Sequence, residues 1–123
     1  MRYLMFVSHS PDVKATSAPP GFFDKMDGFV RESFSSGILK ATGGLLNTSD
    51  AARLDLKGGT LKMTDGPFTE AKELIGGYAI VDVANRQQAV DLATRIKELH
   101  RQHWPGFEGT SEVRPMEYYE PPK

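Results

Sequence analysis

The order of predicted elements along the chain indicates an α+β domain. The chain has 123 residues, of which 39% are hydrophobic, and this is the size and composition of one globular domain with one core. Two segments have apolar residues at helical spacing, and they alternate with runs rich in β-forming residues. The predicted order is strand, helix, strand, hairpin, strand, helix, strand, within a single domain that spans residues 1–123.

The first two predicted elements are a strand and a helix. Residues 2–8 are almost all apolar and β-forming, which is typical of a strand buried on both faces in the middle of a sheet. We expect a helix over residues 20–36, with Pro20 in its first turn and Gly37 as the left-handed residue that ends it. Gly28 lies inside this helix, where glycine costs about 1 kcal/mol relative to alanine, so we expect packing to hold it. The apolar face contains Phe22, Met26, Phe29, Val30 and Ser33.

A second strand and a hairpin are predicted next. Residues 38–46 are expected to form a strand that is bent or bulged at the Gly43-Gly44 pair. Residues 52–56 and 60–64 lie on either side of Lys57-Gly58-Gly59, and their apolar residues alternate with polar ones. This alternation predicts a hairpin with one face exposed to solvent.

The C-terminal half is predicted to hold a loop, a central strand, a helix and a last strand. Residues 65–74 have no clear period and are expected to be a loop with one helical turn after Pro67. Asn85 is a good N-cap and Gln88 follows three residues later, as in a capping box. Trp104 precedes Pro105 and is expected to end this helix. The strands are predicted at residues 75–83 and 111–118, residues 121–123 form a tail, and the helix has an apolar stripe of Ala89, Leu92, Ala93, Ile96 and Leu99.

These elements predict a ferredoxin-like β-α-β-β-α-β core with an extra hairpin. Both helices should cover the same face of the sheet. The other face still carries apolar side chains, and a chain of 123 residues has no further element to cover it. A second copy is the simplest cover, so we expect a homodimer with the sheets packed face to face.

Charge and composition exclude several functions. Fifteen Lys and Arg are scattered among sixteen Asp and Glu, which argues against direct nucleic-acid binding, because that needs a clustered basic surface. The absence of cysteine removes disulfides, thiolate metal sites and a thiol nucleophile, and agrees with a reducing compartment. The apolar run at residues 1–7 is too short for a signal-peptide core or a membrane span. We therefore expect a cytoplasmic protein with no membrane partner.

Four sequence blocks carry a resemblance to a known family. They are Asp65-Gly66-Pro67-Phe68 within residues 63–73, and then residues 76–81, 100–106 and 112–116. In this order and spacing the chain resembles the DGPF (YCII-related) family. The resemblance implies a ferredoxin-like fold in a dimeric α+β barrel, and a superfamily in which small-molecule enzymes are common. It also implies an association with sigma factors of the extracytoplasmic-function type, and hence a role around transcription initiation.

One departure from the family pattern matters for catalysis. The YCII branch carries a His in its first helix and an Asp near its second helix, and these two residues are suspected to be catalytic. Residues 22–36 contain no His, and His100, His103 and Trp104 occupy the region of the Asp. The catalytic pair of that branch is therefore absent from this chain.

Acidic and imidazole side chains are the first candidates for chemistry. Asp65 could act as an acid, a base or a metal ligand, or it could accept hydrogen bonds from the backbone N–H groups of its own Gly-Pro turn. His100 and His103 continue the apolar stripe, so both should point toward the sheet or its rim, where an imidazole can titrate near neutrality. They could share a metal with His9, Asp65 or Glu112, or stabilise the helix C-terminus. No metal-site motif is present, and we predict no metal.

Aromatic side chains and one arginine are candidates for ligand binding. Trp104 and Phe107 either wall a ligand pocket or fill the edge of the core or of the dimer interface. Glu112 and Arg114 alternate along one strand and should project to the same side. Arg114 either clamps a carboxylate or phosphate, or pairs with Glu112 or with a carboxylate across the dimer. The glycine pairs contain no dinucleotide-binding or Walker pattern, and no cofactor is predicted.

Three functions are consistent with these residues. The first is a small-molecule site, with Asp65 and His103 as acid–base residues and with Tyr78, His100, Trp104 and Arg114 as binding residues. We expect its cleft to lie between the sheet and the loops. The second is a regulatory protein that binds an extracytoplasmic-function sigma factor, which depends only on the resemblance. The third is a structural dimer with neither site.

Overall fold

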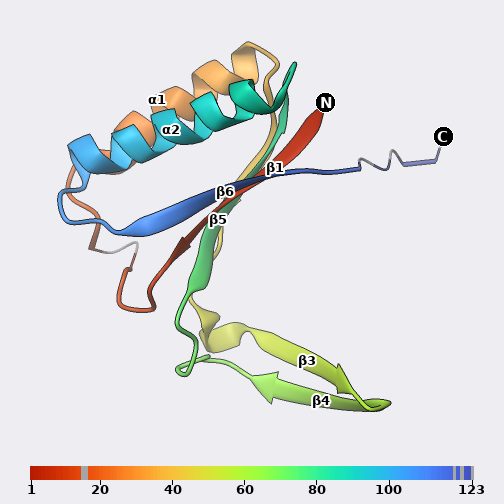
Figure 1. Cartoon of the computed structure of the whole chain (residues 1–123). Helices are drawn as coiled ribbons and strands as arrows, with labels where there is room; N and C mark the ends of the chain where they lie inside the picture. Colours follow the sequence, from red (N-terminus) through yellow and green to blue (C-terminus); the bar gives the residue numbers. More distant parts are fainter. Residues whose placement is uncertain (15–16, 118, 120, 123) are drawn as a thin grey trace.

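The computed structural model describes residues 1–14, 17–117, 119 and 121–122. Within them lies one antiparallel sheet of four strands in the order β2-β5-β1-β6, and β3 and β4 form a separate hairpin. Figure 1 shows the hairpin projecting away from the sheet and the helices. The elements are β1 (Arg2–His9), α1 (Phe22–Ser35), β2 (Leu39–Gly44), the 3-10 turn η2 (Thr48–Asp50), β3 (Ala52–Lys57), β4 (Thr60–Asp65), β5 (Leu74–Asp82), α2 (Arg86–His103) and β6 (Gly109–Pro115).

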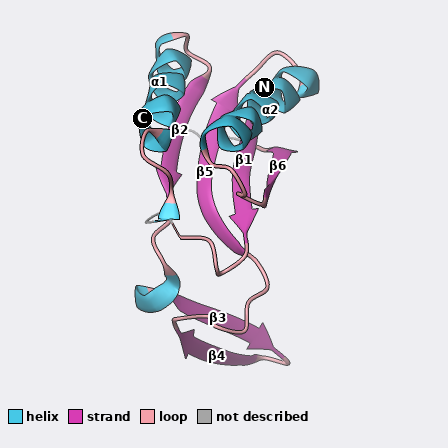
Figure 2. Ribbon diagram, turned by 90° about the vertical axis from the view of Figure 1, so that its left-hand side faces the viewer, coloured by secondary structure: helices cyan, strands magenta, loops and turns pink. Residues whose placement is uncertain are grey.

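The strand order confirms the ferredoxin-like α+β prediction, with the hairpin inserted between β2 and β5. Both helices lie on the same face of the sheet (Figure 2). β1 is a central strand, as predicted, but it is not buried on both faces. Tyr3 and Met5 are buried under the helices, while Leu4 and Phe6, which point the other way, are only half-buried. The reason is that the described chain places no element over the second face.

The core lies between the helices and the covered face of the sheet. Val81 in β5 is 1% exposed and Ala89 in α2 is 0% exposed, so these two residues mark its centre. Phe29, Val30, Ala93, Ile96 and Val113 pack around it as partly buried residues. The buried core consists of Tyr3, Met5, Leu39, Ala79, Val81, Val83, Ala89 and Leu92.

The start of α2 confirms the predicted cap. The Asn85 side chain accepts a hydrogen bond from the Gln88 backbone N–H (2.9 Å), and Gln88 in turn accepts one from the Ala84 N–H (2.8 Å). The helix ends at His103, immediately before Trp104 and Pro105. The Asn85 side chain thus satisfies one of the N–H groups that the helix start leaves unpaired, and the reciprocal bond satisfies the N–H of Ala84, which precedes the N-cap.

The ends of α1 correct one prediction and confirm another. The N-cap is Gly21, with φ 88°, and the helix begins at Phe22, so Pro20 lies outside it. A residue in the left-handed region cannot continue a right-handed helix, which is why the helix starts after Gly21. Gly37 has φ 81° and ends the helix as predicted. Gly28 is not held by packing, because a Cβ added there would meet no atom within 4 Å.

Three smaller expectations are corrected in the sheet and loops. The irregularity in β2 lies between Leu39 and Ala41, whereas Gly43 and Gly44 pair regularly with β5. The segment after Pro67 makes one hydrogen-bonded turn, from the Ala71 N–H to the Phe68 carbonyl (3.3 Å), and no helical turn. β6 begins two residues earlier than predicted and ends at Pro115; Tyr118 lies outside the described residues.

Among the residues that the structure describes, no helix combines the length and apolar character needed to cross a bilayer.

Candidate functional site

The uncovered face of the sheet is the first candidate site. Its side chains alternate with the buried ones along β1, β5 and β6, and they lie in two cross-strand rows. Tyr78, Phe6 and Glu112 form one row, and Ile80, Leu4 and Arg114 form the next. We call these six residues the open face.

Tyr78 takes its position on the open face from a glycine in the neighbouring strand. It pairs with Gly43 across β2 and β5, and a Cβ added at Gly43 would lie 2.9 Å from Cε1 of the Tyr78 ring. The Thr42 hydroxyl donates to the Tyr78 carbonyl oxygen (2.8 Å). Gly43 therefore leaves room for the phenol ring to lie across β2, and the side chain remains 39% exposed.

Arg114 and Glu112 lie on the same side of β6, as the alternation predicted. The Arg114 Nε is 3.8 Å from the Glu112 Oε2, and the two side chains are 70% and 50% exposed. Exposed ion pairs of this kind contribute about 0–1 kcal/mol. Arg114 can therefore exchange Glu112 for another anion at little cost.

The spacing between these polar groups suits a small molecule. Two strand spacings separate β5 from β6, so the Tyr78 and Glu112 backbones lie about 10 Å apart. Phe6 lies between them in the same row. The open face thus has an apolar floor with a phenol on one side and a charged pair on the other.

His100 and Trp104 belong to a different part of the molecule. They lie at the end of α2, on the side of the sheet that the helices cover, and pack with Phe22 and Phe107. The ring centroid of His100 is 5.0 Å from Phe22 and 4.3 Å from Phe107, and Trp104 is 5.1 Å from Phe22 and 5.0 Å from Phe107. Of the two roles predicted for Trp104 and Phe107, this geometry agrees with filling the edge of the core.

The electrostatics of His100 agree with a packing role. It is 8% exposed, and its Nδ1 donates to the Ile96 carbonyl oxygen (2.8 Å). Burial lowers the pKa of this imidazole below its ordinary value, and the nearby Lys97 lowers it further, although the Ile96 bond opposes both effects. Burial therefore favours the neutral form of His100. His103 is half-buried at the last position of α2.

Asp65 lies at the base of the hairpin, where the Asp-Gly-Pro-Phe segment packs against η2. Gly66 donates its N–H to the Ala51 carbonyl (2.7 Å), and a Cβ added at Gly66 would overlap the Thr48 carbonyl oxygen. The Phe68 N–H donates to the Thr48 hydroxyl (3.0 Å). These contacts explain by packing alone why position 66 is a glycine and why the backbone follows this path.

The carboxylate of Asp65 takes no part in this packing. It is exposed, and no described residue donates a hydrogen bond to it, so the expected bonds from its own turn do not form. Beside it, the Arg53 guanidinium lies 4.1 Å from the Phe68 ring centroid and 2.9 Å from the Glu70 carboxylate. The pKa of Glu70 is lowered, first by a backbone hydrogen bond and then by Arg53. Asp65 thus remains available to a ligand or a partner.

The predicted site residues therefore fall into three places. Tyr78 and Arg114 share the open face. His100 and Trp104 pack with Phe22 and Phe107 at the end of α2, where His103 also lies, and Asp65 lies at the hairpin base. The expected single cleft lined by Asp65, His103, Trp104 and Arg114 does not form within one chain, because the sheet separates Arg114 from the helix side.

The hairpin carries an apolar surface on one face, whereas the alternation predicted that only its polar face would be exposed to solvent. Leu54 pairs with Met63 and Leu56 pairs with Leu61, so all four project from one face. Each is between 60% and 69% exposed. We call these four residues the hairpin patch. In a single chain no other described element covers the hairpin patch, so both faces of the hairpin are exposed to solvent.

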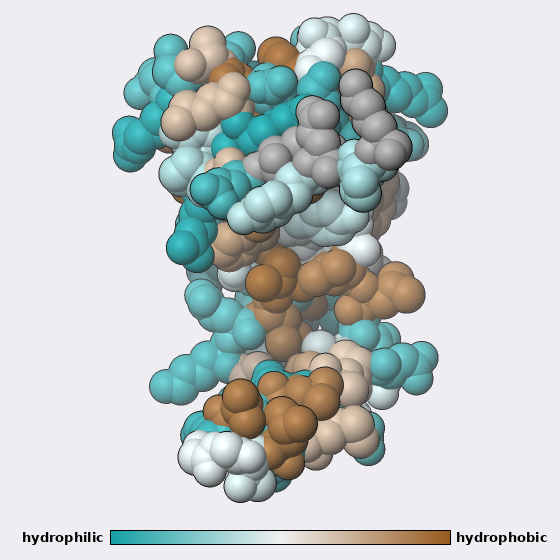
Figure 3. Space-filling view, turned by 90° about the vertical axis from the view of Figure 1, so that its right-hand side faces the viewer, coloured by the Kyte–Doolittle hydropathy of each residue, from teal (hydrophilic) through white to brown (hydrophobic). Residues whose placement is uncertain are grey.

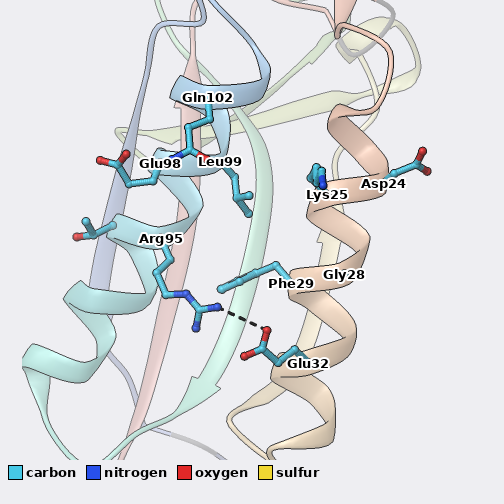
Figure 4. Close-up of a pocket in the computed structure, with 10 residues that line it drawn as sticks. Asp24, Lys25, Gly28, Phe29, Glu32, Arg95, Glu98, Leu99 and Gln102 are labelled. Carbon is cyan, nitrogen blue, oxygen red and sulfur yellow. Dashed lines mark ion pairs between the residues drawn. The ribbon is translucent and has the colours of Figure 1, made fainter.

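A groove of about 570 Å³ lies between α1 and α2 (Figure 4). Arg95 reaches across it, with its guanidinium 4.7 Å from the Phe29 ring centroid and 3.6 Å from the Glu32 carboxylate. None of the predicted site residues lines the groove. Its charged side chains are explained by the contact between the two helices.

Two residues that the sequence analysis missed are Lys97 and Ser111, which line a second pocket between α2 and β6. Lys97 follows Ala93 by four residues and precedes His100 by three. It therefore falls on the buried side of a helix where a charged residue is unexpected. This break in the apolar stripe was the available signal.

Comparison with known proteins relates this chain to a domain family and to a bacterial relative. The family model for the YCII-related domain matches residues 1–104. The "Uncharacterized protein R00369" of Rhizobium meliloti (strain 1021) is 32% identical over 91 residues, which cover 74% of this chain and 69% of the relative.

Proposed function

Because the chain belongs to the YCII-related domain family, we propose that it is a homodimeric protein that binds a small anionic molecule on the open face. The observation that carries this proposal is the arrangement of Tyr78, Phe6 and Arg114 on one uncovered sheet face. The proposed ligand has an anionic group for Arg114 and a flat or apolar part for Phe6. A phenol at the far side can donate a hydrogen bond to a polar substituent.

The proposal requires a second copy, because a ligand site must be concave and a sheet face alone is not. The single chain exposes enough hydrophobic surface to bind a second copy. Figure 3 shows hydrophobic side chains gathered on the hairpin, at the bottom of the view, and on the narrow part of the molecule directly above it. The large exposed hydrophobic residues of the hairpin are Leu54, Leu56, Leu61 and Met63, and Leu45, Leu46 and Ile75 are exposed where β2 ends and β5 begins. Exposed apolar surface of this extent marks an interaction site.

The size of the hairpin patch supports a stable dimer. Burying its four side chains, each about two-thirds exposed, would contribute about 4–8 kcal/mol per chain. Two hairpins would then offset most or all of the cost of association, about 4–15 kcal/mol. In this arrangement the hairpin of one protomer packs on the other protomer. The two sheets then form a dimeric α+β barrel, and their open faces enclose the ligand.

Acid–base chemistry is the catalytic extension of this proposal. The groups of the open face that can exchange a proton are the Tyr78 phenol and the Glu112 carboxylate. Asp65, at the base of the hairpin, would join them only from the partner protomer, because the hairpin projects away from its own sheet (Figure 1). Asp65→Asn would then impair activity without weakening the dimer.

Native mass spectrometry of the freshly purified protein tests the assembly and the ligand together. We expect a dimer, with any retained molecule seen as added mass. A second test uses benzoate as a flat anionic probe in a thermal unfolding assay. Benzoate should raise the Tm of the wild type and of Arg31→Gln, which removes an exposed arginine from α1, but not of Arg114→Gln. A monomeric wild type, or an equal benzoate response in both variants, would refute the proposal.

A second candidate function is binding to an extracytoplasmic-function sigma factor, and the hairpin patch is the observation that favours it. A partner protein could cover the patch as well as a second copy could. This version predicts that an extracytoplasmic-function sigma factor of the same organism co-elutes with the protein in gel filtration and that Leu54→Asp abolishes the complex. Failure to co-elute, together with a dimer that Leu54→Asp dissociates, would leave the homodimer as the use of this surface.

A further inference from the structure

The pocket between α2 and β6 contains two buried polar groups without partners. The Lys97 Nζ and the Ser111 Oγ are both inaccessible to solvent, and within the described chain neither makes a hydrogen bond. Both residues line one pocket of about 230 Å³. The other lining residues are Val90, Ala93, Thr94 and Val113. This pocket lies on the helix side of the sheet and shares no residue with the open face.

Such a pair is unusual in a folded protein. Buried polar side chains are nearly always hydrogen-bonded, and an unsatisfied buried group calls for a bound partner or a function. A lysine can normally extend its amine into solvent, yet here the Nζ lies 5.4 Å from the Phe107 ring centroid and stays buried. The ring face attracts the charge but accepts no ordinary hydrogen bond from it.

The charge of the pocket indicates what is missing. None of the six lining residues is acidic, and Lys97 is the only titratable one among them. His100 lies one turn further along α2, and the charge of Lys97 opposes the protonation of its imidazole. Burial lowers the pKa of the Lys97 amine. An anion next to the amine would raise this pKa again. Among these six lining residues the pocket therefore offers hydrogen-bond donors and a positive charge, but no anionic side chain to balance that charge.

We propose that this pocket binds the carboxylate of a short aliphatic acid, with the Lys97 amine and the Ser111 hydroxyl as donors. The ammonium supplies a charge-assisted hydrogen bond and the hydroxyl supplies a second one. The Val90, Ala93 and Val113 side chains then contact the aliphatic part of the acid. A pocket of about 230 Å³ has room for such a molecule, since a water takes about 30 Å³ of liquid volume.

The competing explanation is that water alone fills the pocket. Waters can bridge buried polar groups that lack protein partners, but they do not neutralise the lysine charge. The two explanations differ in whether the pocket responds to an anion in a saturable way. They can be separated by using the wild-type protein and added acid.

The test is an NMR titration of uniformly isotope-labelled wild-type protein with propionate and, as the neutral match, propionamide. We expect propionate to shift the Lys97 Cε and Nζ signals and the Ser111 amide signal to saturation, with roughly millimolar affinity. Propionamide should have little effect. No saturable shift well above that concentration, or equal shifts from the amide, would overturn the proposal.

Variants then assign the contacts. Lys97→Met should weaken propionate binding roughly tenfold or more, and Ser111→Ala should weaken it roughly two- to tenfold. Lys72→Met, which removes an exposed lysine from the loop after Phe68, is the matched control and should bind like the wild type. If Lys97→Met does not fold, the wild-type titration still decides the question. Full binding by both variants would refute the assignment.

This inference stands apart from the proposed function. Arg114→Gln should abolish the benzoate response and keep the propionate response, whereas Lys97→Met should do the reverse. Failure of one proposal therefore leaves the other open to its own test.

Discussion

Two glycine-to-alanine substitutions are expected to change stability in opposite directions, although they add the same methyl group. At Gly66 the new Cβ would overlap the Thr48 carbonyl oxygen, lie 2.8 Å from its carbonyl carbon and lie 3.2 Å from the Ala51 carbonyl oxygen. All three are backbone atoms, so the η2 turn and the hairpin base must move apart. Gly28 is exposed in the middle of α1, and a Cβ there would meet no atom within 4 Å.

The magnitudes follow from the contacts at each position. Overpacking at Gly66 costs about 1–3 kcal/mol. Moving the η2 turn away from the hairpin base also strains the Gly66-to-Ala51 and Phe68-to-Thr48 hydrogen bonds. Each of these bonds contributes about 0.5–1.5 kcal/mol. We therefore expect Gly66→Ala to lower the free energy of unfolding by about 2–6 kcal/mol. Gly28→Ala should raise it by about 0.5–1 kcal/mol, because alanine is the better helix former.

Thermal and urea unfolding at one fixed protein concentration measure both changes, since the Tm of an oligomer depends on concentration. For a domain of this size, 1 kcal/mol corresponds to about 4 °C. Gly28→Ala should then melt about 2–4 °C above the wild type, and Gly66→Ala about 8 °C or more below it. Hydrogen exchange should place the loss in β3 and β4. A Gly66→Ala protein as stable as the wild type would refute the packing argument for the Asp-Gly-Pro-Phe segment.

Three further changes have expected outcomes. Asn85→Ala should lower the free energy of unfolding by about 1 kcal/mol by removing the α2 cap, whereas Arg86→Ala beside it should be nearly neutral; equal effects on urea unfolding would argue against the cap. Because the folded-state pKa of His100 is lowered from 6.5, the unfolded chain binds the proton more tightly. The contribution of neutral His100 to the free energy of unfolding should therefore be fully present above about pH 6.5. It should be lost as the pH decreases toward the folded-state pKa. His100→Gln should flatten that decrease in urea unfolding midpoints, and an unchanged slope would assign it to other groups. Leu54→Asp should shift the sedimentation of the protein from dimer to monomer while its circular dichroism is kept, and an unshifted dimer would exclude the hairpin patch from the interface.

The sequence predicted the secondary structure well where local chemistry determines it. The Asn85 cap, the left-handed Gly37 and the Gly58-Gly59 hairpin turn depend on residues within a few positions of one another. The same local reasoning failed at Pro20, because Gly21 adopts a left-handed conformation that ends any helical continuation from Pro20. It also misplaced the β2 irregularity, since the role of Gly43 depends on a ring from β5.

The candidate sites were harder to predict, because they depend on which face of the sheet each strand presents. Alternation showed that Glu112 and Arg114 share a side, but only the pairing with β1 places that side away from the helices. His100 continues the apolar stripe of α2, and Trp104 packs beside it at the helix end, which puts both on the opposite side of the sheet from Arg114. For Lys97 and Ser111, far apart in the sequence, only the packing of α2 on β6 shows that they line one pocket.

The position of the hairpin in the chain has a consequence for how this domain can diversify. Gly44 pairs with Gly77, and the Leu45 N–H donates to the Gly76 carbonyl (3.0 Å), so β2 and β5 already meet as neighbours where the hairpin departs. The hairpin is thus an insertion into a connection that a short turn could close. Sequences can lengthen, shorten or replace such an insertion while the sheet keeps its register. If the hairpin selects the partner, the choice of partner can evolve, or be redesigned, independently of the sheet that would bind the ligand.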